Sequence, residues 1–132
     1  MPDIQGIHHV SITVPDIDRS VAWYGDVLGL SKLMDEQHPN DPGYAVILGK
    51  PDWSMCVGIH THPTNEREAF AEHRTGLDHI SFTVADRDEL QAWKSRLEEL
   101  GVEHSPITDR GAYAVLVFRD PDNIQLEFIT MG

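Results

Sequence analysis

The chain has 132 residues, of which 40% are hydrophobic and 24% charged, a mix typical of one globular domain. Twenty-two acidic residues against ten basic ones give a net charge of −12, which argues against partners such as nucleic acid or anionic membranes. No apolar run approaches the roughly 20 residues of a membrane span, and the N-terminus has no signal-peptide pattern. The single cysteine, Cys56, excludes an internal disulfide and is typical of a reducing compartment, so we expect a cytoplasmic protein.

An internal repeat organises the chain. The segment HHVSITVPD at residues 8–16 matches DHISFTVAD at residues 78–86, 70 positions later. The stretches that follow also match, with Trp23 aligned to Trp93. The repeat predicts a single domain over residues 1–132, made of two modules that cover residues 5–64 and 76–132.

The first module begins with an alternating, β-branched segment at residues 9–14, which predicts a strand. Asp16 or Asp18 can cap the helix that follows, and Gly29 can end it. Three further strands are expected near residues 31–36, 43–49 and 54–60. Residues 63–75 are polar and are expected to link the modules, with a short helix at residues 66–73.

The second module repeats this order. Its first strand begins at His79, and its helix has Asp86 as the expected cap and an apolar face of Leu90, Trp93, Leu97 and Leu100. Strands are expected near residues 102–107, 112–118 and 123–129. A four-stranded unit cannot cover its own edges and apolar face, so two copies are expected to pair. The predicted fold is α+β, with two tandem modules forming an open, curved, mixed sheet around a cleft.

Three residues at matched repeat positions are candidates for a metal site. His9 and His79 occupy the same place in the two first strands. Glu127 lies between apolar neighbours in the last strand, so a cleft-facing carboxylate there needs a partner. Two histidines and a carboxylate can hold a divalent ion with positions left for substrate. The first module has Gly58 at the position of Glu127, so a fourth protein ligand is missing there.

The remaining histidines and one tyrosine have weaker signals. His60 shares the expected strand face of Gly58 and is a candidate substitute ligand, substrate contact or acid–base group, and Tyr113 is a candidate acid–base group beside the cleft. His8 is expected on the surface, and Cys56 as a small buried hydrophobe. Loop or helix-surface positions predict solvated side chains for His38, His73 and His104.

The duplicated H-[VI]-S-[IF]-T-V-x-D starts and the late D-P-D-N-I-Q-L-E-F run resemble the vicinal oxygen chelate superfamily. That group includes glyoxalase I, bleomycin-resistance and fosfomycin-resistance proteins, and extradiol dioxygenases. The resemblance implies βαβββ modules and metal ligands from the first and last strands. Those ligands correspond to His9, His79 and Glu127, and the fourth family position falls on Gly58. The implied cofactor is a divalent ion, with Fe, Zn, Mn, Ni and Co all open.

The sequence supports two hypotheses from different functional classes and a third, non-catalytic alternative. The first is a metal-dependent enzyme acting on a small-molecule substrate with vicinal oxygens, by lyase, isomerase or dioxygenase chemistry. The second is a metal-free protein that sequesters a cationic, bleomycin-like drug, which the −12 charge favours. The third is a degenerate relative with a structural or regulatory role. A homodimer is expected in each case.

Overall fold

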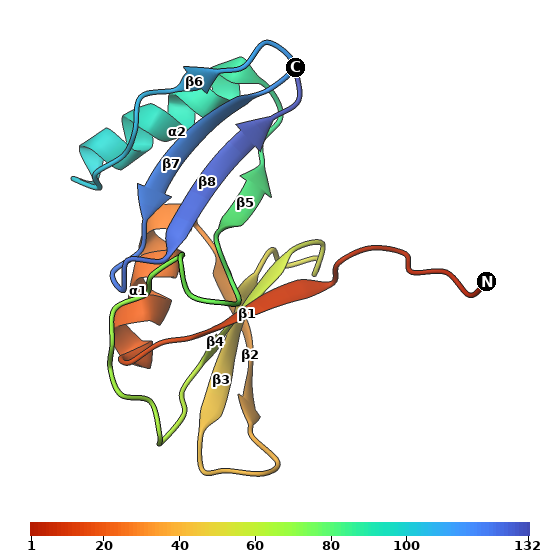
Figure 1. Cartoon of the computed structure of the whole chain (residues 1–132), viewed down its shortest axis with the longest axis vertical. Helices are drawn as coiled ribbons and strands as arrows, with labels where there is room; N and C mark the ends of the chain where they lie inside the picture. The colour runs from red at the N-terminus through yellow and green to blue at the C-terminus, as the bar shows by residue number, and fades with distance from the viewer. The chain divides into compact units, whose positions relative to one another are not determined.

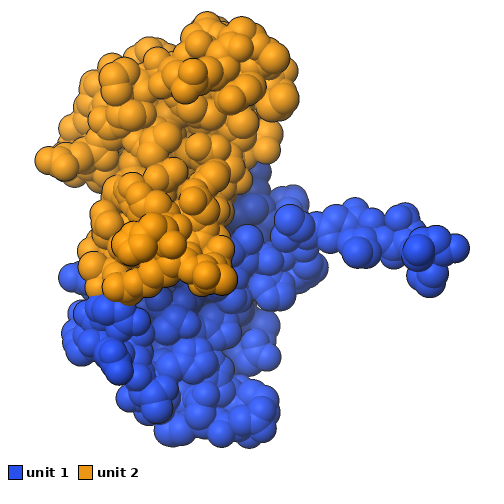
Figure 2. All heavy atoms as spheres, viewed as in Figure 1, with its two compact units in different colours: residues 1–68 blue, residues 69–132 orange.

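Two successive βαβββ modules make up the structure, a computed structural model that describes residues 1–132 (Figure 1). The chain divides into two units, residues 1–68 and 69–132 (Figure 2), and each contains one module. The predicted α+β class and the duplicated module are confirmed. No helix has the length and apolar character that a membrane crossing requires.

The first unit is a four-stranded mixed sheet with one helix. The strand order is β1-β4-β3-β2, with β1 and β4 parallel and the other pairs antiparallel. The bounds of its elements are β1 His9–Thr13, α1 Ile17–Leu28, β2 Ser31–Gln37, β3 Tyr44–Gly49 and β4 Cys56–His60.

Local signals set the ends of α1. The Asp16 carboxylate accepts a hydrogen bond from the Arg19 backbone N–H at 3.1 Å, which satisfies one of the free donors of the first turn. Gly29 ends the helix in the left-handed region, with φ of 71°, where a side chain would be strained. The helix packs on β3 and β4, and its buried side chains include Tyr24 and Val27.

The second unit repeats the arrangement, with strand order β5-β8-β7-β6 and a parallel β5–β8 pair. The bounds of its elements are β5 Ile80–Thr83, α2 Arg87–Glu99, β6 Thr108–Asp109, β7 Ala114–Arg119 and β8 Gln125–Thr130. Asp86 caps α2 by accepting from the Glu89 N–H at 2.8 Å.

The core of the second unit lies between α2 and its sheet. Leu90 and Leu97 of the helix are fully buried. Trp93 stacks on Phe128 at 4.4 Å between ring centroids, and Phe118 stacks on the same ring at 4.8 Å. Burial of each such side chain stabilises the fold by about 1.5–3 kcal/mol. Leu100 was expected on this face but is exposed, because α2 ends at Glu99.

Two predicted elements are wrong. Residues 66–73 form no helix. Arg67 adopts a left-handed φ of 61°, and its guanidinium donates to the Pro15 carbonyl at 2.8 Å instead. The strand expected at residues 102–107 is replaced by a single bridge at His104 and the short β6. Pro106 lies in that segment and has no N–H to donate to a strand ladder.

Candidate functional site

In each unit the helix covers one face of the sheet, and the candidate residues lie on the other face. In the first unit, His9, Ser11 and Thr13 of β1 stand opposite Cys56, Gly58 and His60 of β4. In the second unit, Ser81 of β5 stands opposite Glu127 of β8. Ser11 and Ser81 are equivalent in the repeat, so strand register makes Gly58 the counterpart of Glu127, as the sequence predicts.

His79 and Glu127 lie together in the second unit. The His79 Nε2 atom is 3.7 Å from the Glu127 Oε1 atom, and the Glu127 side chain is only 15% exposed. On the other side of the ring, His79 Nδ1 is 2.7 Å from the Asp78 carboxylate. Because a carboxylate only accepts hydrogen bonds, Asp78 favours the tautomer with the proton on Nδ1. The lone pair of Nε2 then faces Glu127.

This pair fits a divalent ion. Two ligand atoms bonded to one ion at about 2.1 Å lie roughly 3.0–3.4 Å apart, close to the 3.7 Å between His79 Nε2 and Glu127 Oε1. A carboxylate on the far nitrogen, like that of Asp78, is the usual way in which proteins orient a histidine ligand.

His9 begins β1 in the first unit and is exposed. Its Nδ1 atom is 2.8 Å from the Nδ1 of His8, and the two rings meet edge to face. His8 is exposed, as expected, and lies against His9. The prediction that His9 acts together with His79 and Glu127 stays a prediction.

Neighbouring side chains fill the space that a side chain at Gly58 would need. A Cβ there would lie 2.5 Å from the Ser11 hydroxyl oxygen and 3.1 Å from His60 Nε2. His60 therefore leans toward Gly58 on their shared strand face. Cys56, one alternation earlier, is buried as predicted.

The structure brings together three histidines, of which the sequence singled out only His60 as a candidate ligand. His38, the residue after β2, has a side chain that is only 11% exposed, so the expectation that it is solvated is wrong. Its Nε2 atom lies 2.9 Å from His60 Nδ1, and its ring lies 4.7 Å from the ring of His62. Burial, followed by the neighbouring charges of His38 and His62, lowers the pKa of His60 below its usual value. In the sequence, the H-x-H spacing of residues 60 and 62 is the pattern that indicates this group.

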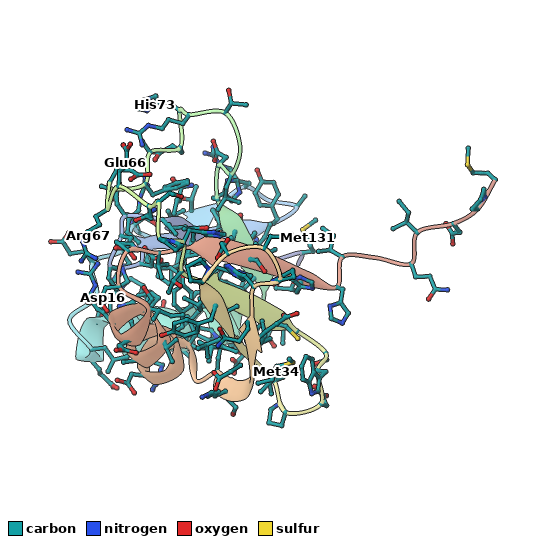
Figure 3. All side chains as sticks on the ribbon, turned by 90° about the horizontal axis from the view of Figure 1, so that it is seen from below. Asp16, Met34, Glu66, Arg67, His73 and Met131 are labelled. Atoms are coloured by element: carbon teal, nitrogen blue, oxygen red, sulfur yellow. The ribbon has the colours of Figure 1, made fainter.

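The remaining candidates, His73, His104 and Tyr113, belong to the second unit. His104 is half-buried against the Ser105 carbonyl and the Glu98 carboxylate, so its expected solvation is also wrong. His73 is exposed in the loop after residue 68, as predicted (Figure 3). Tyr113 is exposed next to the start of β7.

The fold and its duplicated strand register define a glyoxalase-type protein. The chain belongs to the Glyoxalase/Bleomycin resistance protein/Dioxygenase superfamily, whose model matches residues 6–128. The predicted family is thus confirmed.

Individual relatives are similar to nearly the whole of this chain. A lactoylglutathione lyase of Haemophilus influenzae is 30% identical over 93% of this chain and 90% of its own length. The putative ring-cleaving dioxygenase MhqA of Bacillus subtilis is 27% identical over 97% of this chain, which spans only 40% of MhqA. The crystal structure of a glyoxylase/bleomycin resistance protein/dioxygenase domain from Frankia sp. EAN1pec is 30% identical. It superposes with a TM-score of 0.87 over 98% of this chain and 100% of that domain.

Proposed function

We propose that this protein is a metal-dependent enzyme acting on a small substrate with two vicinal oxygens, by lyase, isomerase or dioxygenase chemistry. The observation that supports it most directly is the pairing of His79 Nε2 with the half-buried Glu127 carboxylate. The similar lactoylglutathione lyase and ring-cleaving dioxygenase belong to the reaction classes considered.

The ligands of the ion are His9, His79 and Glu127 in this proposal. His79 and Glu127 contribute one nitrogen and one oxygen, and Asp78 holds the His79 ring in orientation. His9 is the repeat equivalent of His79 and supplies the third ligand. A bound divalent ion activates substrate oxygens as a Lewis acid, or activates O₂ where the ion is iron. Gly58 adds no ligand, so coordination positions are left for the substrate.

The proton-transfer groups, the oligomeric state and the location are also proposals. Tyr113 and His60 are the candidate acid–base residues, and Tyr113 is exposed enough to meet a ligand. We further propose a homodimer in the cytoplasm.

The alternative of a metal-free drug-sequestering protein is favoured by the −12 charge. However, a pocket for a cation has no need of the Asp78–His79–Glu127 arrangement.

Elemental analysis of tag-free protein tests the proposal. We expect an ion that is lost in His79→Ala and in Glu127→Gln, and also in His9→Ala, while circular dichroism stays unchanged. His73→Ala is the matched control, because that imidazole is exposed in a loop. Iron would direct the search to oxygenase substrates, and Zn, Ni or Mn to lyase and isomerase substrates. Unchanged metal content in His79→Ala would contradict the proposal, and stoichiometric bleomycin binding without metal would favour sequestration.

A further inference from the structure

Three imidazoles gather at one end of the first sheet, outside the proposed catalytic ligands. His60 ends β4, His62 follows two residues later, and His38 follows β2. Each offers one nitrogen, and these three atoms all lie within 4.8 Å of one another. The rings of His38 and His60 are stacked, with centroids 5.1 Å apart, and the rings of His60 and His62 are nearly parallel at 8°. All three residues are half-buried.

Asp41 orients this group. One of its carboxylate oxygens lies 2.8 Å from His38 Nδ1, and the other lies 3.4 Å from His62 Nδ1. Because the carboxylate only accepts, it favours a proton on His38 Nδ1. The lone pair of His38 Nε2 then points at His60 Nδ1, 2.9 Å away. This is the carboxylate–histidine arrangement that supports metal ligands in proteins.

The loop that carries His38 and Asp41 is fixed in place. The Gly43 N–H donates to Asp41 at 2.6 Å, and the His38 N–H donates to the Gly43 carbonyl at 3.0 Å. A Cβ at Gly43 would lie 2.7 Å from the Asp41 carboxylate and 2.8 Å from His38 Nδ1, and it would also meet the Thr61 carbonyl. Only glycine therefore lets the loop close with both side chains turned toward β4.

We propose that His38, His60 and His62 bind a borderline divalent ion, Zn²⁺ or a metal of similar ligand preference, with Asp41 as the orienting carboxylate. None of these residues is among the proposed catalytic ligands His9, His79 and Glu127. Imidazole nitrogens suit Zn, Co, Ni and Cu, whereas Mg²⁺ and Ca²⁺ prefer oxygen ligands.

Binding replaces the hydrogen bond between two imidazoles by two bonds to one ion. With the His38 proton on Nδ1, the neutral His60 ring donates its Nδ1 proton to His38 Nε2 across 2.9 Å in the absence of metal. When the ion takes that place, the His60 proton moves from Nδ1 to Nε2, so the ring stays neutral with no net release of a proton, and His62 turns in as the third ligand. Tetrahedral ligands at about 2.05 Å lie roughly 3.3 Å apart, so the His38–His60 pair opens slightly while His62 moves inward. A His60 nitrogen bound to metal does not transfer protons. This inference therefore assigns His60 to metal binding in place of acid–base chemistry.

The test uses the full, tag-free chain after a chelator has removed its metal. It measures the number of ions bound per chain and the visible absorption spectrum with Co²⁺. The wild type is expected to take up two Zn²⁺ per chain. His62→Ala and His38→Ala are expected to take up one. Asp41→Asn is expected to weaken that binding by about 10–100-fold, the usual effect of losing an orienting partner. Co²⁺ should give tetrahedral absorption bands in the visible range that vanish in His62→Ala.

Variants of the two sites separate this inference from the proposed function. His79→Ala is expected to keep one ion and the histidine-group spectrum, and His73→Ala is expected to keep two ions. One ion that is kept in His79→Ala and lost in His62→Ala would uphold this inference and remove the proposed catalytic site. Unchanged uptake in both His62→Ala and Asp41→Asn would overturn the inference. Loss of all metal in His79→Ala would also overturn it, because the histidines would then belong to one shared site. His62→Gln provides a second variant if His62→Ala does not fold.

Discussion

Gly58 shows at the scale of one residue why the repeat is not symmetric. A Cβ at this position would lie 2.5 Å from the Ser11 hydroxyl and 3.1 Å from His60 Nε2. Gly58→Ala is therefore expected to lower the free energy of unfolding by about 1–3 kcal/mol, the usual cost of overpacking. Urea unfolding followed by circular dichroism measures this change.

Removal of the side chain that blocks Gly58 provides the control. In the Ser11→Ala, Gly58→Ala double variant the nearest clash is gone, so much of the lost stability should return as a coupling energy. A loss that is the same in the single and double variants would mean that Ser11 does not set the size limit at Gly58.

The sequence predicted some residues of the candidate sites and missed others, for a physical reason. His9, His79 and Glu127 were singled out because the repeat aligns them, and this alignment does not depend on how the loops fold. His38 was missed because its contact with His60 joins positions 22 residues apart through a loop. The closure of that loop depends on Gly43 and on one Asp41 carboxylate.

At the scale of elements, hydrophobic alternation and helix caps predicted both helices and most strands to within two residues. These predictions fail where a proline, or a contact with a residue distant in the sequence, determines the local backbone structure. Pro106 interrupts the expected strand at residues 102–107. Arg67 leaves the helical region and binds the Pro15 carbonyl, 52 positions away, and no local pattern reports such a contact.

An ion pair ties the loop before β5 to β7 in the second unit. Arg119 donates to both oxygens of Glu72 at 3.0 Å, and the guanidinium lowers the pKa of Glu72 to about 2 from 4.5. The stability from this pair is fully present above pH 4.5 and is lost as the pH falls through about 2.

Glu72→Gln is therefore expected to be less stable than the wild type at pH 6, with the difference shrinking as the pH falls from 4.5 toward 2. The effect is modest, because both partners are partly exposed and screened by solvent. Urea midpoints across this range measure it, with the exposed Glu103→Gln as the charge-matched control. Parallel pH profiles for wild type and Glu72→Gln would show that the pair contributes no pH dependence.

For the molecule as a whole, sheet edges and apolar side chains lead us to expect self-association. Each four-stranded sheet has two edge strands, β1 and β2 in the first and β5 and β6 in the second, and an edge strand can pair with another chain. The extended segment before β1 (Figure 1) also carries Ile4 and Ile7, which are 87% and 88% exposed. Association with another chain would remove these two apolar side chains from water.

Sedimentation at micromolar concentration is expected to give about twice the chain mass of 14.9 kDa. The Ile4→Ser, Ile7→Ser double variant should shift the protein toward the monomer without loss of secondary structure, because neither side chain is packed within its own unit. Gln5→Ser, at an exposed position between them, is the control and should leave the mass unchanged. A wild type that sediments as a monomer would remove the homodimer proposal. A double variant that stays dimeric would instead place the interface away from residues 1–8, with the sheet edges as the next surfaces to change.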